Sequence, residues 1–316
     1  MATVDRKTMI MIAKLYYLGN LSQEEIAQMM NLSRLKVSRV LKACRERRLV
    51  EFRFNDAVQY DELAQSIKEL YGLQEVIVVP SEANLERRTA AVGEKTAMLL
   101  VKLLRDGMNI GFSWGRHVTQ MVRQFPPITF NGCMVVQLTG GTYIPTMNFD
   151  ANEVIRDFAR KIDARFSLLQ TPLTVQNVIT REYLMQEPAI KRHFDLFGQI
   201  DVAVVGCGSS NCEESPTYLS GHMTLEEARL LQQQGVGADL CGHRMTHDGL
   251  PADCSLSGRV LSIDLPTLKK VPMVIAATSG ADKVETLLAG IRGGILKAMV
   301  IDELAAIGLL KAPGIQ

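Results

Sequence analysis

Short apolar runs alternate with amphipathic stretches along most of this chain. The runs are typical of β-strands, and the stretches between them are typical of α-helices. We expect strands at 75–79, 108–112, 133–138, 166–169, 202–205, 260–263, 273–277 and 298–301, and helices at 61–71, 86–105, 115–124, 150–163, 181–197, 224–234, 281–292 and 302–310. This βαβ alternation predicts an α/β fold in which helices cover both faces of a Rossmann-like parallel sheet.

The N-terminal region departs from the alternation and predicts a second, smaller domain. A length of 316 residues suits two domains of unequal size. We place them at 1–55 and 56–316, with the linker at about 55–60. Residues 1–55 hold 11 Lys and Arg against 5 Asp and Glu, whereas the rest of the chain holds 24 against 29. A basic head on an acidic body predicts a polyanionic partner for the head alone.

The head has the pattern of a winged helix-turn-helix. We expect helices at 7–19, 23–30 and 34–47, and residues 49–54 alternate as a β-ribbon would. Ser22 and Glu25 have the spacing of a capping box, and Ser33 is placed to cap the third helix. The core between the last two helices is predicted to contain Ile26, Ala27, Leu32, Val37, Val40 and Leu41.

The outward face of the third helix is basic, which is typical of a DNA recognition helix. Side chains near the start of such a helix contact base edges in the major groove. The alternative is a solvated basic face on an ordinary helical hairpin. We assign base contacts to Arg34, Leu35, Lys36, Ser38 and Arg39 and phosphate contacts to Gln23 and Lys42, and Ser33 completes the predicted DNA-binding set.

A Gly- and Ser-containing turn at 109–118 joins a predicted strand to a predicted helix, as anion-binding turns do. Gly115 lets the backbone come close to a ligand, and the side chains of Ser113, Arg116 and His117 add hydrogen-bond donors. The alternative is a purely structural turn.

Two further turns also follow predicted strands. One contains Thr139, Gly140 and Gly141, which offer hydroxyl and backbone donors. The other places Lys283 in the first turn of a helix, where a positive charge opposes the helix dipole unless a bound anion offsets it. Ligands of open α/β sheets bind outside the carboxyl ends of the strands, so we expect the three turns to form one anion site.

Three short polar side chains near helix starts or loops suit sugar hydroxyls: Asp150, Asn152 and Asp239. Helix capping or solvation explains each of them equally well. Cys241, His243 and His247 lie close in sequence but lack a matching fourth ligand, so no metal is expected. The six cysteines have no CxxC spacing and are expected to be free thiols.

Taken together, several segments across nearly the whole chain resemble the SorC family of bacterial sugar-responsive regulators. They are Ala13–Tyr17, Leu32–Arg39, Ile110–Arg116, Asp201–Gly206, Gly237–Gly242, Gly293-Gly294 and Val300–Asp302. Two positions depart from the family's pattern: Ser279-Gly280 stands where relatives often carry Gly-Gly, and Arg116-His117 where some carry two Thr.

The resemblance implies a DNA-binding transcription regulator of a carbohydrate-utilisation operon, gated by a phosphorylated sugar or sugar alcohol. Its effector domain would be similar to glucosamine-6-phosphate deaminase and ribose-5-phosphate isomerase. By position, phosphate contacts fall on Ser113, Gly115, Arg116, His117 and Lys283, and contacts to the rest of the ligand on Thr139, Asp150, Asn152 and Asp239.

Family members act as dimers and tetramers, so the implied partners are operator DNA, the effector and further copies of the chain. No cofactor is implied. The alternative is a sugar-phosphate isomerase or deaminase carrying a DNA-binding head, although no carboxylate–His pair is tied to the turns. The start of the chain has no signal-peptide pattern and no apolar run is long enough to span a bilayer, so we expect a cytoplasmic protein.

Overall fold

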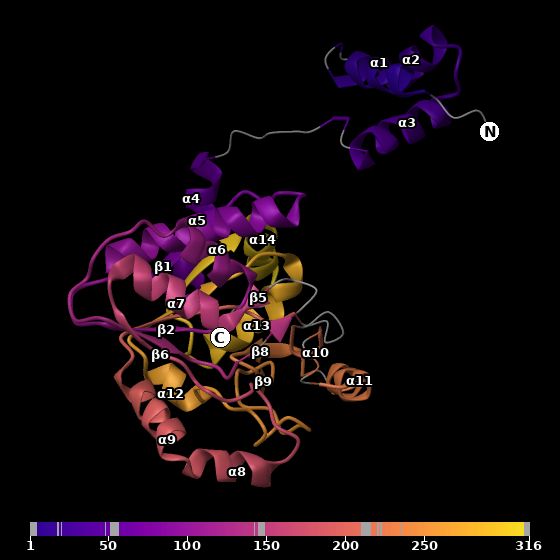
Figure 1. Cartoon of the computed structure of the whole chain (residues 1–316). Helices are drawn as coiled ribbons and strands as arrows, with labels where there is room; N and C mark the ends of the chain where they lie inside the picture. Colours follow the sequence, from indigo (N-terminus) through magenta and orange to yellow (C-terminus); the bar gives the residue numbers. More distant parts are fainter. Residues whose placement is uncertain are drawn as a thin grey trace. The chain divides into compact units, whose positions relative to one another are not determined.

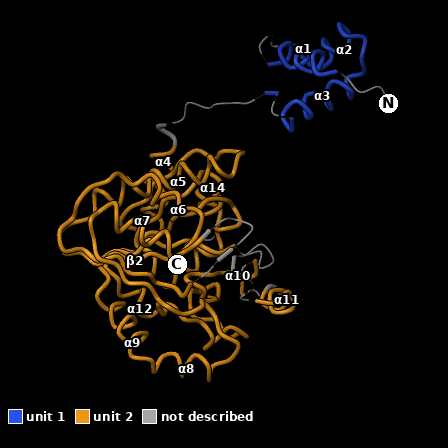
Figure 2. Tube along the Cα trace, in the orientation of Figure 1, with its two compact units in different colours: residues 1–56 blue, residues 57–316 orange. Residues whose placement is uncertain are grey.

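The chain divides into two compact units in a computed structural model, one comprising residues 1–56 and the other residues 57–316 (Figure 2). The structure describes residues 5–17, 19, 21–47, 49–50, 57–141, 143–144, 149–209, 216–219, 221, 223–234 and 236–312. Each unit has its own apolar core.

Within its described residues, the first unit contains three helices: α1 (Arg6–Tyr17), α2 (Gln23–Met29) and α3 (Arg34–Glu46) (Figure 1). All three were expected from the sequence. Their apolar faces form one core, whose buried members are Met9, Ile12, Ala13, Ile26, Ala27, Val37, Val40, Leu41 and Cys44. The predicted β-ribbon falls mostly on residues 51–56, which lie outside the described residues; Leu49 and Val50 form a bend.

Hydrogen-bonded caps at Ser22 and Ser33 mark the starts of α2 and α3, as the sequence predicts. The Ser22 hydroxyl accepts a hydrogen bond from the Glu25 amide at 3.2 Å, and the Ser22 amide donates to the Glu25 carboxylate at 2.7 Å. Ser33 caps α3 by accepting from the Lys36 amide at 3.2 Å. These bonds satisfy backbone donors that a helix start leaves open, so they fix where α2 and α3 begin.

The second unit is built on a seven-stranded parallel sheet, which confirms the predicted α/β architecture. Its order is β1-β11-β10-β7-β2-β3-β6. The strands are β1 (Glu75–Val79), β2 (Asn109–Phe112), β3 (Met134–Gln137), β6 (Arg165–Ser167), β7 (Val202–Val205), β10 (Met273–Ala277) and β11 (Ala298–Asp302).

Helices cover both faces of this sheet, because alternate residues of its strands enter two different cores. Val202 and Val204 of β7 pack in one core, and Ala203 and Val205 in the other. The first core includes α5 (Leu85–Leu103), α6 (Arg116–Gln124) and α7 (Ala151–Ile162). The second includes α4 (Ala57–Tyr71), α9 (Pro188–Asp195), the 3-10 helix η2 (Leu196–Gln199), α12 (Leu265–Lys270), α13 (Val284–Arg292) and α14 (Glu303–Lys311).

The remaining elements lie outside the main sheet. Two short antiparallel pairs are β4 (Tyr143–Ile144) with β5 (Phe149–Asp150) and β8 (Ala238–Leu240) with β9 (His243–Met245). The helices are α8 (Val178–Gln186), α10 (Pro216–Leu219), α11 (Leu225–Gln233) and the 3-10 helix η4 (Ala281–Lys283).

Three predicted elements were wrong. The single helix expected at 181–197 is divided into α8, α9 and η2, because Glu187 precedes a proline and adopts an extended conformation. The run 260–263 forms only isolated bridges, from Val260 to Thr174 and from Ser262 to Thr139. Helix α4 begins at residue 57, inside the stretch expected to be linker.

The sheet has its topological switch point between β2 and β7, where α/β folds form a crevice. From β2 the chain proceeds to β3 and β6 on one side, and from β7 it proceeds to β10 and β11 on the other. Helices leaving two adjacent strands in opposite directions open a crevice at the carboxyl end of the sheet, and such crevices bind ligands in α/β proteins.

Candidate functional site

The turns that follow β2 and β7 meet at this crevice. Ser113, the first residue after β2, is buried, and its hydroxyl accepts a hydrogen bond from the Gly206 amide at 3.0 Å. Gly115 has a φ of 146° and precedes α6 without a side-chain cap. A residue with a side chain would rarely adopt that φ, so glycine is required for the turn that places the first amides of α6 at the crevice.

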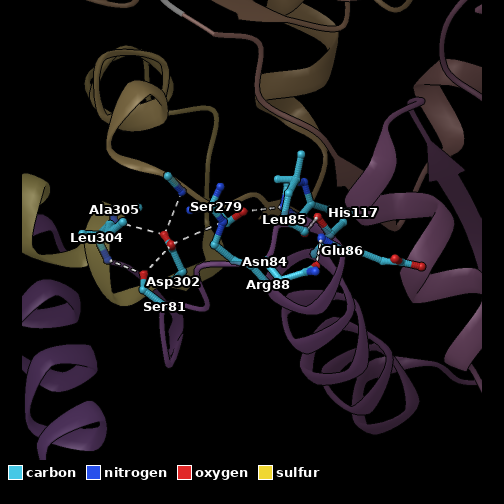
Figure 3. A network of polar contacts seen from close by, with 12 residues as sticks. Ser81, Asn84, Leu85, Glu86, Arg88, His117, Ser279, Asp302, Leu304 and Ala305 are labelled. Atoms are coloured by element: carbon cyan, nitrogen blue, oxygen red, sulfur yellow. Dashed lines mark hydrogen bonds and ion pairs between the residues drawn. The ribbon is translucent and has the colours of Figure 1, made fainter. Parts of the chain in front are cut away.

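His117 connects α6 to the turn that follows β10. Its Nε2 lies 2.8 Å from the Ser279 hydroxyl (Figure 3). The pKa of the imidazole is lowered to about 3, first because the ring is buried and second because cationic side chains lie near it. His117 is therefore neutral near pH 7 and supplies a polar ring nitrogen rather than a charge.

Three positive side chains surround this neutral ring. In order of decreasing effect on the His117 pKa they are Lys283, Arg116 and Arg88. Lys283 belongs to η4 and Arg116 is the first residue of α6, whereas Arg88 lies in the first turn of α5. Positive charge at the start of a helix is unfavourable, and an anion bound among these side chains would offset it.

One carboxylate partly balances the cations. Lys283 Nζ lies 2.9 Å from Asp282 Oδ2, and the Asp282 side chain is 48% exposed. Burial raises the pKa of Asp282, but the hydrogen bond from Lys283 and its charge outweigh that effect, so the pKa is lowered overall. The carboxylate is ionised near neutral pH and competes with an incoming anion for Lys283.

Arg88 was not predicted from the sequence as a site residue. Its Nε is buried, has no hydrogen-bond partner among the described residues and lies 4.0 Å from Asp302 Oδ2 (Figure 3). The available signal was topological: α5 begins just beyond β1, so its first turn lies at the same edge of the sheet as the other turns. The Asn84 side chain caps that turn by accepting from the amides of Glu86 and Arg87.

Asp302 holds the turn after β10 in place. This fully buried carboxylate accepts hydrogen bonds from the amides of Gly280 at 2.8 Å and Ala305 at 3.1 Å, and from the Ser81 hydroxyl at 2.6 Å (Figure 3). It is therefore a structural group that caps α14 and links the ends of β1, β10 and β11.

The turn after β3 offers a hydroxyl but not the expected backbone donors. The Gly140 amide donates to Leu261 O at 2.8 Å, and the Gly141 amide donates to Thr171 O at 2.7 Å. Both amides are thus engaged within the protein. A Cβ at Gly140 would lie 2.3 Å from Pro172 O, so this position requires glycine. Thr139 Oγ1 is buried without a hydrogen-bond partner among the described residues.

Two of the three polar side chains proposed for sugar hydroxyls, Asp150 and Asp239, have structural contacts. Asp150 caps α7 by accepting from the Asn152 amide at 2.8 Å. Asp239 is buried, accepts from the Gly242 amide at 3.0 Å and lies 3.4 Å from Arg244 Nη2. Capping accounts for Asp150, and a buried ion pair accounts for Asp239. The cap at Asp150 is the alternative that the sequence left open, whereas the ion pair of Asp239 was not expected.

A second polar cluster, at the ends of β3 and β6, was missed. His193 Nε2 lies 2.8 Å from Gln137 O, and its Nδ1 lies 2.8 Å from the Ser167 hydroxyl. Burial lowers the pKa of His193. Gln137 Nε2 is buried without a hydrogen-bond partner in the described part of the chain. Because these residues are far apart in sequence, no local pattern indicates that they meet.

In the head, most of the predicted DNA contacts are exposed. Ser33, Arg34, Leu35, Ser38, Arg39 and Lys42 are exposed, whereas Gln23 and Lys36 are half-buried. Arg34 Nε lies 3.5 Å from Glu24 Oε2, and Lys42 Nζ lies 3.9 Å from Glu46 Oε1. These pairs are solvent-exposed and weak, so the cations remain able to bind phosphate.

Comparisons with known proteins identify the family of the chain. Residues 55–311 match the family model described as "Putative sugar-binding domain". The chain is 29% identical to the sorbitol operon regulator of Klebsiella pneumoniae over 313 residues, covering 97% of this chain and 98% of that one. It is 28% identical to the deoxyribonucleoside regulator of Bacillus subtilis (strain 168), covering 94% and 95%.

The structural comparison agrees. The crystal structure of the full-length sorbitol operon regulator SorC from Klebsiella pneumoniae superimposes with a TM-score of 0.74 at 28% identity, covering 98% of this chain and 100% of that chain. These relatives are named as transcription regulators rather than enzymes. Within the described residues, no helix combines the length and apolar character needed to cross a bilayer. The chain belongs to the SorC family of sugar-binding transcription regulators.

Proposed function

We propose that the chain controls a carbohydrate-utilisation operon and that a phosphorylated sugar or sugar alcohol gates its binding to operator DNA. One observation carries the effector part of this proposal: three cationic side chains converge on a neutral, buried histidine at the carboxyl edge of the sheet. A phosphate group brings about two negative charges and needs several donors to replace its water. Asp282 and Asp302 balance part of this positive charge, and an uncharged sugar would make no use of the remainder.

We assign the phosphate contacts to Ser113, Gly115, Arg116, His117 and Lys283, and add Arg88. Arg116 and Lys283 supply charge, the start of α6 supplies amides, and His117 supplies a ring nitrogen. Thr139 is the best-supported contact to the rest of the ligand, since its hydroxyl is buried and has no partner among the described residues. Asp150, Asn152 and Asp239 stay in the proposed set as candidates for hydroxyl groups, and Gly140 and Gly141 as backbone that lines the site.

The names of the relatives indicate the class of ligand but not which ligand binds. One is named for a sorbitol operon and another for deoxyribonucleosides. Both names refer to a small sugar alcohol or a sugar-containing molecule. We therefore favour a monosaccharide-sized phosphate ester, the size of ligand that the proposed similarity of the effector domain to sugar-phosphate isomerases and deaminases would also imply.

For the head we propose a winged helix-turn-helix whose α3 enters the major groove. A single unit of three short helices offers few base contacts, so two copies are expected to bind the two halves of a palindromic operator. Dimers or tetramers provide the pair of heads. The effector would then act by binding one arrangement of the assembly more tightly than the other.

The test uses the full chain and DNA selected from random duplexes for tight binding. Operator binding is followed by fluorescence anisotropy while pentose, hexose and hexitol phosphates are added, each beside its unphosphorylated counterpart. We expect one phosphate ester to change operator affinity at concentrations where the free sugar has no effect. Equal potency of the two forms would contradict the phosphate assignment, and failure to select any sequence would contradict the DNA-binding function.

A further inference from the structure

Leu35 is the one exposed apolar residue of α3, whose other exposed residues are polar or charged. It is 62% exposed. It is the second residue of α3, between Arg34 and Lys36. Single exposed leucines are common on proteins and mean little by themselves. What distinguishes this one is its direction on the helix.

The buried residues of α3 define the inward direction of this helix. They are Val37, Val40, Leu41 and Cys44. At ~100° per residue, Leu35 lies about 170° from their mean direction. Arg39 and Lys42, at i+4 and i+7, each lie about 150° away by the same count. Leu35 therefore belongs to the outermost stripe of α3, together with Arg39 and Lys42, two of the cations proposed to contact DNA.

The major groove offers only one apolar group to such a side chain, the C5-methyl group of thymine. Every other base edge presents hydrogen-bond donors or acceptors there, and covering those with a leucine would remove water without replacing its hydrogen bonds. We propose that Leu35 packs against the methyl group of a thymine in the operator and makes that thymine a specificity determinant. This proposal rests on the DNA-binding function proposed above.

The geometry also limits where the thymine lies. Side chains four residues apart on a helix are about 6 Å from each other. Successive base pairs are about 3.4 Å apart along DNA. The thymine contacted by Leu35 is therefore expected within about two base pairs of the base contacted by Arg39. The operator half-site should contain a thymine and the partner base of Arg39 as near neighbours.

The experiment removes the methyl group and nothing else. In an operator selected with the full chain, each thymine is replaced in turn by deoxyuridine, and the Kd is measured for wild type and Leu35→Ala. For wild type we expect one thymine per half-site at which deoxyuridine weakens binding about fourfold, the effect of one buried methyl group. Leu35→Ala should bind the thymine and deoxyuridine duplexes equally.

Two further variants keep the test decisive. Leu35→Met retains an apolar side chain and should retain the preference for thymine, and Met11→Ala removes a half-exposed apolar side chain from α1 and should leave the preference unchanged. A methyl effect of the same size in Leu35→Ala, or no methyl effect in wild type, would overturn the proposal while leaving DNA binding intact. If the full chain selects no DNA sequence at all, the result contradicts the proposed DNA-binding function itself.

Discussion

His117 Nε2 lies 2.8 Å from Ser279 Oγ, and this contact joins the start of α6 to the turn after β10. The two residues are 162 positions apart in the sequence. The turns that they connect carry Arg116 and Lys283, so the contact holds the two cations of the proposed phosphate site in one arrangement. Because the ring is neutral, it does so without adding a further positive charge to those of Arg116, Lys283 and Arg88.

The lowered pKa of His117 predicts acid sensitivity. In the unfolded chain the imidazole has its ordinary pKa of 6.5, whereas in the folded chain it is about 3. Between these values the unfolded state binds a proton that the folded state does not, so stability falls as the pH falls from about 6.5 towards 3. The slope from this one group is at most about 1.4 kcal/mol per pH unit.

His117→Gln removes this titrating group. The free energy of unfolding of the variant should therefore decline less steeply than that of wild type as the pH falls. Urea unfolding at pH 7.5, 5.5 and 4.5 measures the difference. Some acid sensitivity should persist in the variant, because burial also lowers the pKa values of His193 and His243. Identical slopes for variant and wild type would show that His117 is protonated in the folded state.

Lys283 and its neighbour Asp282 should have opposite effects on the effector. Lys283→Ala removes a charge-assisted contact worth roughly 1.5–3 kcal/mol, so affinity for a phosphorylated ligand should fall about ten- to a hundredfold. Arg116→Ala should weaken binding in the same way. Asp282→Asn removes the carboxylate that lies 2.9 Å from Lys283 and should tighten binding up to about fivefold.

Calorimetry with the phosphate ester identified by the anisotropy screen measures all of these variants. Lys102→Ala is the matched control, since it removes an exposed lysine from the last turn of α5. Weaker binding by Asp282→Asn would mean that this carboxylate contacts the ligand directly rather than competing with it.

Asp302 is expected to matter for stability more than for affinity. Asp302→Ala leaves the buried amides of Gly280 and Ala305 without their acceptor and should cost about 3 kcal/mol. Asp302→Asn keeps an acceptor oxygen and should cost markedly less. Chemical denaturation of the two variants gives the comparison. Equal losses would indicate that the negative charge, facing Arg88, stabilises the fold more than the hydrogen bonds do.

Most strands were predictable because they are buried on both faces and therefore appear as apolar runs, whereas the edge strand β6 is largely exposed. An apolar run also predicted a strand at 260–263, and this prediction was wrong. The run is buried by packing but pairs only through isolated bridges. The β8–β9 hairpin was missed because Asp239 and Arg244 interrupt the apolar pattern, although they pair with each other inside the protein.

The site was predictable to the extent that it depends on topology. Turns after parallel strands lie at one edge, so the meeting of the β2 and β10 turns follows from the alternation itself. Side-chain contacts do not follow from it. Arg88 and the partners of the Gly140 and Gly141 amides depend on how α5 and the 171–173 segment pack, and no local pattern records that packing.

Two cations on the outer stripe of α3 should differ in how they contribute to DNA binding. Arg39 lies one turn after Leu35 and is exposed. An arginine there can donate two hydrogen bonds to one guanine. Arg39→Ala should therefore cost about 1–3 kcal/mol on the operator and relax specificity at one base pair. Selecting operators with the variant and comparing base preferences tests this. Equal losses on operator and random DNA would contradict a base contact.

Lys42 lies just over two turns from the start of α3 and is exposed, with Glu46 3.9 Å away as its only ion-pair partner among the described residues. A lysine at this distance from the helix start is expected to bind a phosphate rather than a base. A phosphate contact releases a counterion, so Lys42→Ala should weaken operator and random duplexes alike and reduce the dependence of log K on log salt by about one unit. Titrations from low to moderate salt measure the slope, with Lys102→Ala as a control that makes the same change in net charge in the second unit. An unchanged slope, or a loss confined to the operator, would place Lys42 away from the backbone.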